Sequence, residues 1–183
     1  MLVGPRQVGK STLAWRHVAG RPPEEVLVLN AEERLVQRWA RSPTQVLHDL
    51  AGQFPAVRTL FVEEAQNLEE AGLFVKGLVD AKRGYELLVT GSSSYHLQAR
   101  TRESLAGRAT RQTLLPFSIG ELMDHEALVV PAAKAERANT VLSRQMRVGS
   151  YPGVWFHPDP ERHLGDLVEA FVVRDASDRF AIR

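Results

Sequence analysis

Short apolar runs alternate with segments of helical periodicity over the first two thirds of the chain. Four or five residues of strand character, bounded by turn-forming residues, predict buried strands over 26–29, 59–62, 86–90 and 111–115. Apolar residues at helical spacing predict helices over 31–41, 44–54 and 69–82. Such alternation of strands and helices predicts an α/β fold, a three-layer sandwich in which helices cover both faces of a mainly parallel sheet.

The pattern changes after about residue 126. A polar helix rich in alanine and arginine is predicted over 132–148, a loop over 149–153 and a helix over 161–180. Just before this change, Ser118 is expected to cap a short helix, with Glu121 three residues further on. We therefore predict one α/β domain over residues 1–126 and a helical C-terminal segment over residues 127–183.

Residues 4–12 fit the pattern G-x-x-x-x-G-K-[ST] of the phosphate-binding loop, the Walker A motif. Gly4 and Gly9 allow backbone conformations that are closed to residues with a Cβ, and a close approach to phosphate oxygens. Backbone N–H groups of the loop and of the following helix then point at the anion. Lys10 is expected to reach the β- and γ-phosphates, and Ser11 to ligate Mg²⁺. The predicted nucleotide-binding residues are Gly4, Pro5, Arg6, Gln7, Val8, Gly9, Lys10, Ser11 and Thr12.

A phosphate-binding loop has to follow a strand and open a helix. The helix is predicted by apolar residues that would pack on the sheet, namely Leu13, Ala14, Trp15 and Val18. Before the loop stand only Met1, Leu2 and Val3, which are too few for a full strand. The sequence therefore predicts the helix after the loop, but it leaves only a short lead-in of three residues for the strand before it.

Glu63 and Glu64 directly follow the apolar run over 59–62. Ligands of parallel sheets bind at the carboxyl ends of the strands, so both carboxylates are candidates for nucleotide chemistry. We assign Glu63 to Mg²⁺, through water, and Glu64 to the attacking water. Thr90 and Ser92 follow the next strand, and we expect them to contact the γ-phosphate or the attacking water, with an ordinary serine-rich turn as the alternative.

Composition narrows the class of protein. A net charge of +1 argues against a strongly basic nucleic-acid footprint, and the absence of cysteine excludes a disulfide framework and a cysteine metal site. No apolar run reaches the 18 or so residues that a membrane span needs, and the start lacks the pattern of a secretory signal. We therefore expect a cytoplasmic protein that does not contact membranes.

An ordered set of motifs resembles a known family. These motifs are Gly4–Ser11, Leu60–Gln66, Thr90–Ser94, Leu105–Arg108, Leu115–Ser118 with Glu121, and Gly149–Pro152. They are similar to the AAA-superfamily ATPase domain of poorly characterised prokaryotic ATP-binding proteins, which usually continue into a winged-helix region and a further domain. The resemblance implies a core that binds and hydrolyses ATP, with Glu64 as its catalytic glutamate. It also implies that Arg108 contacts phosphate, in this subunit or in a neighbouring one, as an arginine finger does.

The chain departs from that family in three places. Glu63 stands where the family has aspartate, and one extra methylene moves the carboxylate by more than about 1 Å, enough to weaken metal geometry or catalysis. The chain also begins almost on the phosphate-binding loop and stops near Arg183, so we expect a fragment or a shortened member.

The function that we predict is an Mg²⁺-dependent ATPase core that couples nucleotide state to conformational change, with ATP and Mg²⁺ as cofactors. The first alternative is a nucleotide-binding switch or scaffold with negligible hydrolysis, and the second is a small-molecule kinase. Adjacent carboxylates after an apolar strand favour water over a kinase acceptor as the nucleophile. A protein or nucleic-acid client, a homo-oligomer and a preference for ATP over GTP are left open.

Overall fold

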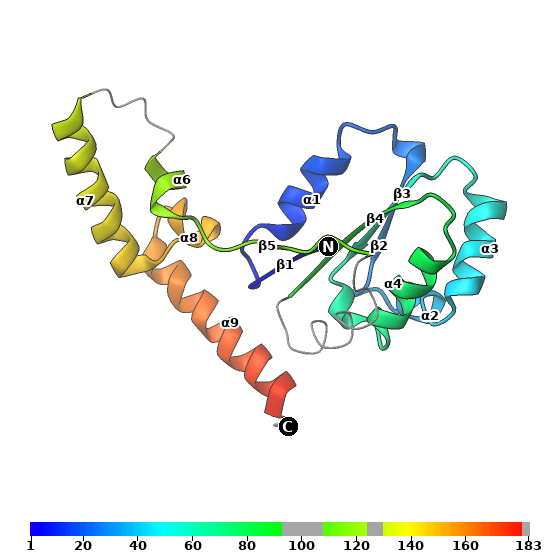
Figure 1. The fold of residues 1–183 in the computed structure, drawn as a ribbon. Coiled ribbons are helices and arrows are strands. Elements are labelled where there is room, and N and C mark those ends of the chain that lie inside the picture. The colour runs from blue at the N-terminus through cyan, green and yellow to red at the C-terminus, as the bar shows by residue number, and fades with distance from the viewer. Residues whose placement is uncertain (93–107, 124–129, 181–183) are drawn as a thin grey trace. The chain divides into compact units, whose positions relative to one another are not determined.

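The computed structural model of the chain describes residues 1–92, 108–123 and 130–180 (Figure 1). The chain divides into two compact units, Met1–Leu114 and Leu115–Arg183. The domain boundary predicted at residues 126 and 127 lies outside the described residues and stays a prediction. The motif residues Ser93, Ser94 and 105–107 also lie outside them.

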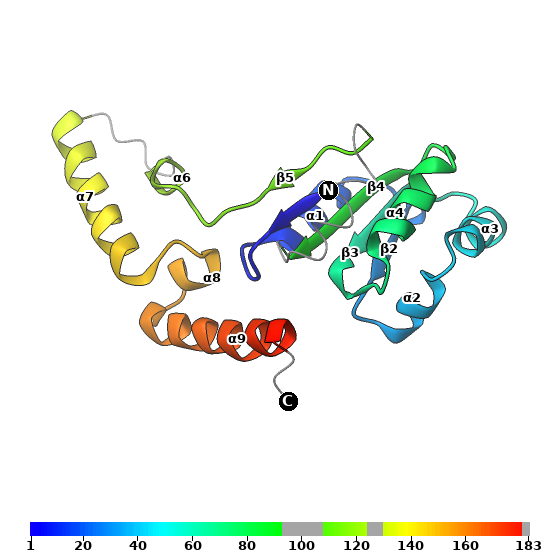
Figure 2. The same cartoon turned by 60° about the horizontal axis from the view of Figure 1, so that its bottom comes forward.

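A parallel sheet of five strands is the centre of the first unit. The strands are β1 (Leu2–Gly4), β2 (Val26–Asn30), β3 (Thr59–Glu63), β4 (Glu86–Ser92) and β5 (Gln112–Thr113). They lie in the order β2-β3-β4-β1-β5, and each pair of neighbours runs parallel (Figure 2). The α/β fold with a parallel sheet is thereby confirmed, and β5 covers only the middle of the strand predicted over 111–115.

The strand before the phosphate-binding loop is only three residues long, as its short lead-in suggested. It is nevertheless an interior strand, because Leu2 is in register with Thr90 of β4 on one side and with Gln112 of β5 on the other. Val3 in its middle is fully buried. Pairing on both edges therefore makes up for the strand's length and fixes where the loop begins.

Four helices belong to the described part of this unit: α1 (Lys10–Val18), α2 (Arg34–Trp39), α3 (Pro43–Gln53) and α4 (Ala71–Asp80). Two single 3-10 turns, η1 (Pro23–Glu25) and η2 (Ala65–Asn67), complete it. The α2 helix starts three residues later than predicted, because Asn30 accepts a hydrogen bond from the Glu32 N–H and holds a turn there (3.0 Å). Ser42 caps α3 by accepting from the Gln45 N–H at 3.2 Å.

Helices cover both faces of the sheet, as predicted. Leu60 and Val62 of β3 point into the main core, which includes residues of α3 and α4. Phe61 points to the opposite face, where its ring meets that of Trp15 on α1 edge to face, with centroids 5.6 Å apart. On α1, Ala14 and Val18 are buried, whereas Leu13 and Trp15 remain about half exposed.

The second unit is helical, with α6 (Ile119–Met123), α7 (Pro131–Val148), α8 (Pro152–Trp155) and α9 (Pro160–Phe180). The predicted cap of α6 is confirmed as a capping box: Ser118 Oγ accepts from the Glu121 N–H (3.2 Å), and Glu121 Oε2 accepts from the Ser118 N–H (2.8 Å). The loop predicted over 149–153 is shorter than expected, because Pro152 already opens α8.

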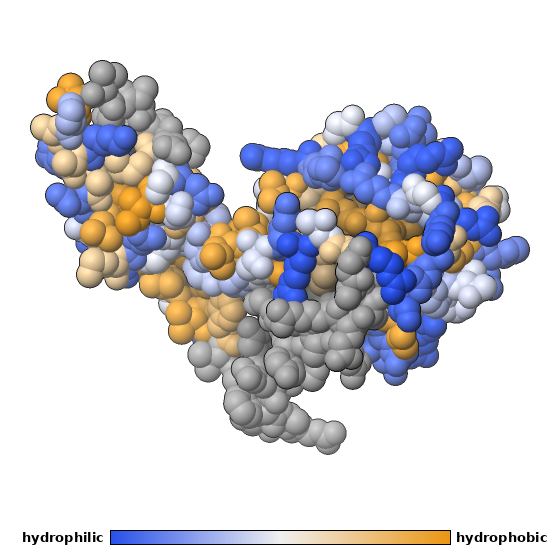
Figure 3. All heavy atoms as spheres, in the orientation of Figure 1, coloured by the Kyte–Doolittle hydropathy of each residue, from blue (hydrophilic) through white to orange (hydrophobic). Residues whose placement is uncertain are grey.

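Two small apolar clusters hold this helical unit together. Leu122, Val141 and Trp155 form one, and Val148, Val154 and Leu167 form the other. Large apolar side chains such as Met146 and Phe156 stay exposed, and Figure 3 shows hydrophobic residues on the face that it presents. The unit is therefore stabilised by two local cores rather than by one continuous core.

Candidate functional site

The phosphate-binding loop connects β1 to α1 through two left-handed residues. Gly9, at the cap of α1, has φ 97° and ψ 15°, a conformation that glycine adopts without strain. Gln7 has φ 58°, which costs a residue with a Cβ about 1–2 kcal/mol. The loop thus turns sharply onto the N-terminus of a nine-residue helix, the end of a helix that attracts anions.

Gly4 is needed for a different reason from the one that the motif suggested. Gly4 is not among the positive-φ residues of the described chain, so the prediction that it adopts a backbone conformation closed to residues with a Cβ is wrong. A Cβ at this position would lie 2.2 Å from the carbonyl oxygen of Leu114, the residue after β5. Gly4 therefore permits close backbone approach inside the sheet, and through it the start of the loop.

Lys10 is the most deeply placed charge of the loop. Its side chain is 4% exposed, and its Nζ donates to the Pro5 carbonyl oxygen at 2.8 Å. Burial lowers the pKa of the Lys10 ammonium below its ordinary value, Glu64 acts in the opposite direction, and Arg6 adds to the lowering. A buried ammonium at the N-terminus of a helix favours an anionic ligand, because a negative charge would offset its desolvation.

The other residues of the motif occupy different environments. Val8 is buried and packs beside Gly4, whereas Pro5, Arg6 and Ser11 are partly buried. Thr12 is exposed on α1. Backbone N–H groups of the loop can serve an anion whatever the side chain, so the side chains that bear on ligand chemistry are those of Lys10 and Ser11.

The two carboxylates stand where β3 ends. Glu63 is in register with Asn30 of β2, and it shares the face of β3 that carries Phe61 and meets α1. Glu64 would point the opposite way on a continued strand, but it takes a left-handed conformation with φ 51° and ψ 44°. The chain turns at Glu64, and the charge of Glu64 acts on Lys10 by raising the pKa of its ammonium against the effect of burial.

Two sets of hydrogen bonds connect Glu64 to the end of β4, one directly and one through Gln66. The Glu64 backbone N–H donates to Thr90 Oγ1 at 3.3 Å, and its Oε2 accepts from Gln66 Nε2 at 2.5 Å. The Gln66 Oε1 in turn accepts from the Ser92 N–H at 2.9 Å. Sequence reasoning included Thr90 and Ser92 among the site residues, whereas Gln66 was noted only as the last residue of a family motif and was given no role.

A comparison with known families agrees with this geometry. A family model described as an AAA domain matches residues 1–123. The chain belongs to the AAA domain family. Membership indicates a nucleotide-binding, ATPase-like domain, and the family resemblance drawn from the motifs is confirmed.

A curated relative shows the same likeness over a greater length. The uncharacterised protein MJ1544 of Methanocaldococcus jannaschii is 23% identical over 190 residues, and the match covers 100% of this chain. The chain spans 43% of the length of that relative. The similarity thus extends beyond the AAA domain into the helical unit.

Arg108 lies apart from the other candidate residues of this AAA domain. It forms an ion pair with Asp80, the last residue of α4. It lines a cavity of about 470 Å³ together with Met1 and Thr110, which precede β1 and β5. That is the amino end of the sheet, whereas Lys10 and Glu64 follow the carboxyl ends of strands. Within this unit the structure does not bring Arg108 to them.

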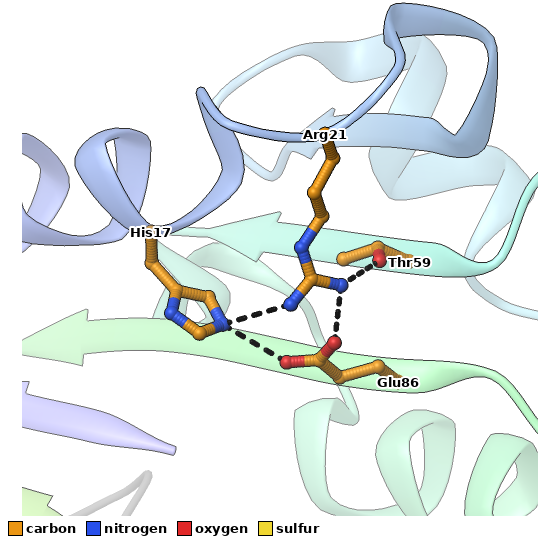
Figure 4. Close-up of polar contacts among 4 residues, drawn as sticks. All are labelled: His17, Arg21, Thr59 and Glu86. Atoms are coloured by element: carbon orange, nitrogen blue, oxygen red, sulfur yellow. Dashed lines mark hydrogen bonds and ion pairs between the residues drawn. The ribbon is translucent and has the colours of Figure 1, made fainter.

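A polar cluster that sequence reasoning missed also lies at the amino end of the sheet (Figure 4). Arg21, just after α1, donates to Thr59 of β3 and to Glu86 of β4. His17 Nε2 lies 3.0 Å from Glu86 Oε1. Hydrogen bonds from Arg21 first, and then from His17, lower the pKa of the Glu86 carboxyl. This cluster ties the end of α1 to the starts of two strands.

The described residues also bear on metals and membranes. Over residues 1–92, 108–123 and 130–180, no group of three or more histidine, aspartate or glutamate side chains is arranged to hold a metal ion. Magnesium does not require such a group, because it keeps several waters and binds through one or two protein oxygens plus substrate phosphates. No helix in the described chain is long and apolar enough to cross a membrane.

Proposed function

We propose that this AAA domain binds ATP with Mg²⁺, hydrolyses it, and passes the change of nucleotide state to a partner or to the helical unit. The observation that carries the proposal is the buried Lys10 ammonium at the start of α1, electrostatically coupled to Glu64. A phosphate chain on the loop would neutralise Lys10 and bring its last phosphate towards that carboxylate.

The residues at the strand ends have separate roles in this proposal. Lys10 and the loop N–H groups bind the β- and γ-phosphates, and Glu64 orients and activates the attacking water. Thr90 and Ser92, at the end of β4, stand next to Glu64 and contact the γ-phosphate or the water. Arg108 lies at the amino end of the sheet, away from Lys10 and Glu64, so its proposed phosphate contact is made to a neighbouring copy.

The donor set fits a magnesium ion. Ser11 offers a hydroxyl at the start of α1, and Glu63 offers a carboxylate on the face of β3 that meets this helix. Two oxygen donors beside a phosphate chain suit Mg²⁺, which retains several of its waters. When bound, Mg²⁺ neutralises charge on the β- and γ-phosphate oxygens.

The alternative is a nucleotide switch with negligible turnover, and Glu63 favours it. The carboxylate of Glu63 extends one methylene further than the aspartate that family members have at this position. A displacement of about 1 Å in a positioning group can lower a rate about 10²-fold. The two functions share the binding site and differ only in what happens after binding.

The experiment compares binding of a non-hydrolysable ATP analogue with phosphate release from Mg²⁺–ATP. Glu64→Gln should lower kcat by about 10²–10⁴-fold, because it removes a general base, while analogue affinity stays within about threefold. Glu70→Gln, the same change at an exposed glutamate, serves as the control. Turnover that survives Glu64→Gln would exclude the assigned role.

The same assay separates the two functions. If Glu63 limits hydrolysis, Glu63→Asp should raise kcat by up to about 10²-fold without tighter analogue binding. Binding without turnover in both the natural chain and Glu63→Asp would favour the switch. Absence of analogue binding would contradict both functions.

A further inference from the structure

Gln66 bridges the candidate water-activating glutamate and the end of β4. Its amide nitrogen donates to Glu64 Oε2 at 2.5 Å, and its amide oxygen accepts from the Ser92 backbone N–H at 2.9 Å. The residue lies on η2, the 3-10 turn that directly follows Glu64. One partly buried side chain therefore connects Glu64, directly after β3, to Ser92 of β4, which lies 26 positions after Gln66 in the sequence.

The chemistry of the two partners fixes the orientation of this amide. A backbone N–H can only donate a hydrogen bond, and an ionised carboxylate can only accept one. A flipped amide would set N–H against N–H at Ser92 and oxygen against oxygen at Glu64. The bridge therefore has a single polarity, from the Ser92 N–H through the Gln66 amide to the Glu64 carboxylate.

A second tether to β4 restrains the backbone of Glu64. Its N–H donates to the hydroxyl of Thr90, which is fully buried. Thr90 and Ser92 are two residues apart on the same strand, so the backbone and the carboxylate of Glu64 are held by one element. The left-handed conformation of Glu64 needs such support, because it is strained for a residue with a Cβ.

We propose that Gln66 is a positioning residue, which holds the Glu64 carboxylate in its working orientation and makes that orientation depend on the end of β4. The inference rests on the proposed function, in which Glu64 acts on water and Ser92 stands beside the γ-phosphate. A movement of the Ser92 backbone reaches the carboxylate through the rigid amide, so Glu64 responds to whatever occupies the γ-phosphate position.

The first test is a kinetic split. Gln66→Met keeps the length of the side chain and removes both hydrogen bonds, so kcat should fall by about 10–100-fold, as for a displaced general base. KM and the affinity for a non-hydrolysable ATP analogue should change by less than about threefold, since Gln66 binds no phosphate in this proposal. Gln53→Met, the same substitution at an exposed glutamine, is the control.

The second test asks whether Gln66 acts through Glu64. In the Glu64→Gln background, Gln66→Met should change the residual turnover by less than about twofold, because effects of residues that act as a unit are not additive. Fully additive losses, or a rise in KM at constant kcat, would overturn the inference. Loss of turnover on Glu64→Gln alone, with no effect of Gln66→Met, would leave the proposed function intact and exclude the positioning role.

A third measurement needs no turnover. Gln66→Glu keeps an acceptor for Ser92 but puts a second carboxylate against Glu64, and like charges this close disfavour double ionisation. The Tm of Gln66→Glu should therefore fall further below that of the natural chain at pH 7 than at pH 4, and Glu64→Gln should abolish this pH dependence. A pH dependence that persists in the double variant would show that the two side chains do not meet.

Discussion

The two ends of the same sheet have opposite electrostatic character. At the carboxyl end, burial lowers the pKa of Lys10, so the fold disfavours the charged form of that residue. At the amino end, Arg21 and His17 lower the pKa of Glu86, so the fold favours its charged form. The first arrangement opposes stability and suits a site that awaits an anion, whereas the second contributes to stability.

The helix α1 and the strands β3 and β4 contribute residues to both ends of the sheet. The α1 helix begins at Lys10 and carries His17 in its last turn, and β3 and β4 begin at Thr59 and Glu86. Of the three left-handed non-glycine residues in the described part of the chain, Gln7 and Glu64 lie at the other end, and the third, Lys82, precedes β4. Because the elements are tied together at one end, the other end can hold strained and partly desolvated groups.

Of the substitutions that test the difference between the two ends of the sheet, Lys10→Met should have the largest effect. It should weaken ATP binding by at least about 10²-fold, because the charge-assisted contacts to phosphate are lost. The Tm of the nucleotide-free protein should rise, since an apolar side chain of similar length suits the buried site. Thermal unfolding with and without Mg²⁺–ATP checks both effects. In the natural chain, saturating nucleotide should raise the Tm by about 2–4 °C for each kcal/mol of stabilisation, and in Lys10→Met this rise should disappear.

The destabilisation caused by the buried Lys10 ammonium should also depend on pH. The folded pKa lies below the unfolded one, so the destabilising effect is present at neutral pH and fades as pH rises through the folded pKa. The stability difference between Lys10→Met and the natural chain should therefore shrink at alkaline pH. A Tm lowered by Lys10→Met in the absence of nucleotide would contradict the view that this end opposes stability.

Arg21→Met should have the second largest effect, and on stability rather than on binding. It removes donors to Thr59 and Glu86, and hydrogen bonds to charged groups contribute about 1.5–3 kcal/mol when buried. The side chains of Arg21 and Glu86 are 28% and 45% exposed, so solvent screening reduces the expected loss to about 1–2 kcal/mol. Denaturant unfolding measures the loss.

A matched control makes this prediction specific. Arg16→Met removes an exposed arginine from the last turn of the same helix and should change stability by less than about 0.5 kcal/mol. The affinity for the ATP analogue should stay unchanged in both variants. Equal losses of stability in the two would mean that the helix terminus, and not the cluster, is responsible.

Glu86→Gln should have the smallest effect, with a pH dependence of defined sign. The folded pKa of Glu86 is depressed, so its contribution to stability is complete above the unfolded value of about 4.3 and is lost as pH falls through the folded pKa. The natural chain should be the more stable by up to about 1 kcal/mol at pH 7, because the pair is half exposed. As the pH falls through the folded pKa of Glu86, the two unfolding curves should converge, and a constant difference would contradict the assignment.

Local patterns were enough to identify the phosphate-binding loop, the strands and the position of Glu63 and Glu64. The loop motif lies within nine consecutive residues, and a buried parallel strand reads as one apolar run, so neither depends on distant parts of the chain. Helix boundaries came within a few residues wherever a cap such as Ser42 or Ser118 was visible. Exposure was less predictable, since Leu13 and Trp15, which were expected to pack on the sheet, are about half exposed.

Only the tertiary structure decided which side chains meet. The order β2-β3-β4 puts Gln66 beside Ser92 and Thr59 beside Glu86, and it brings His17 to Glu86 across 69 positions of sequence. Gly4 is required because Leu114 approaches it from another strand, and Arg108 is held at the far end of the sheet by Asp80. The spacing of apolar and polar residues determines the secondary structure of short segments. Contacts between segments depend on strand order and side-chain direction, which no local pattern encodes.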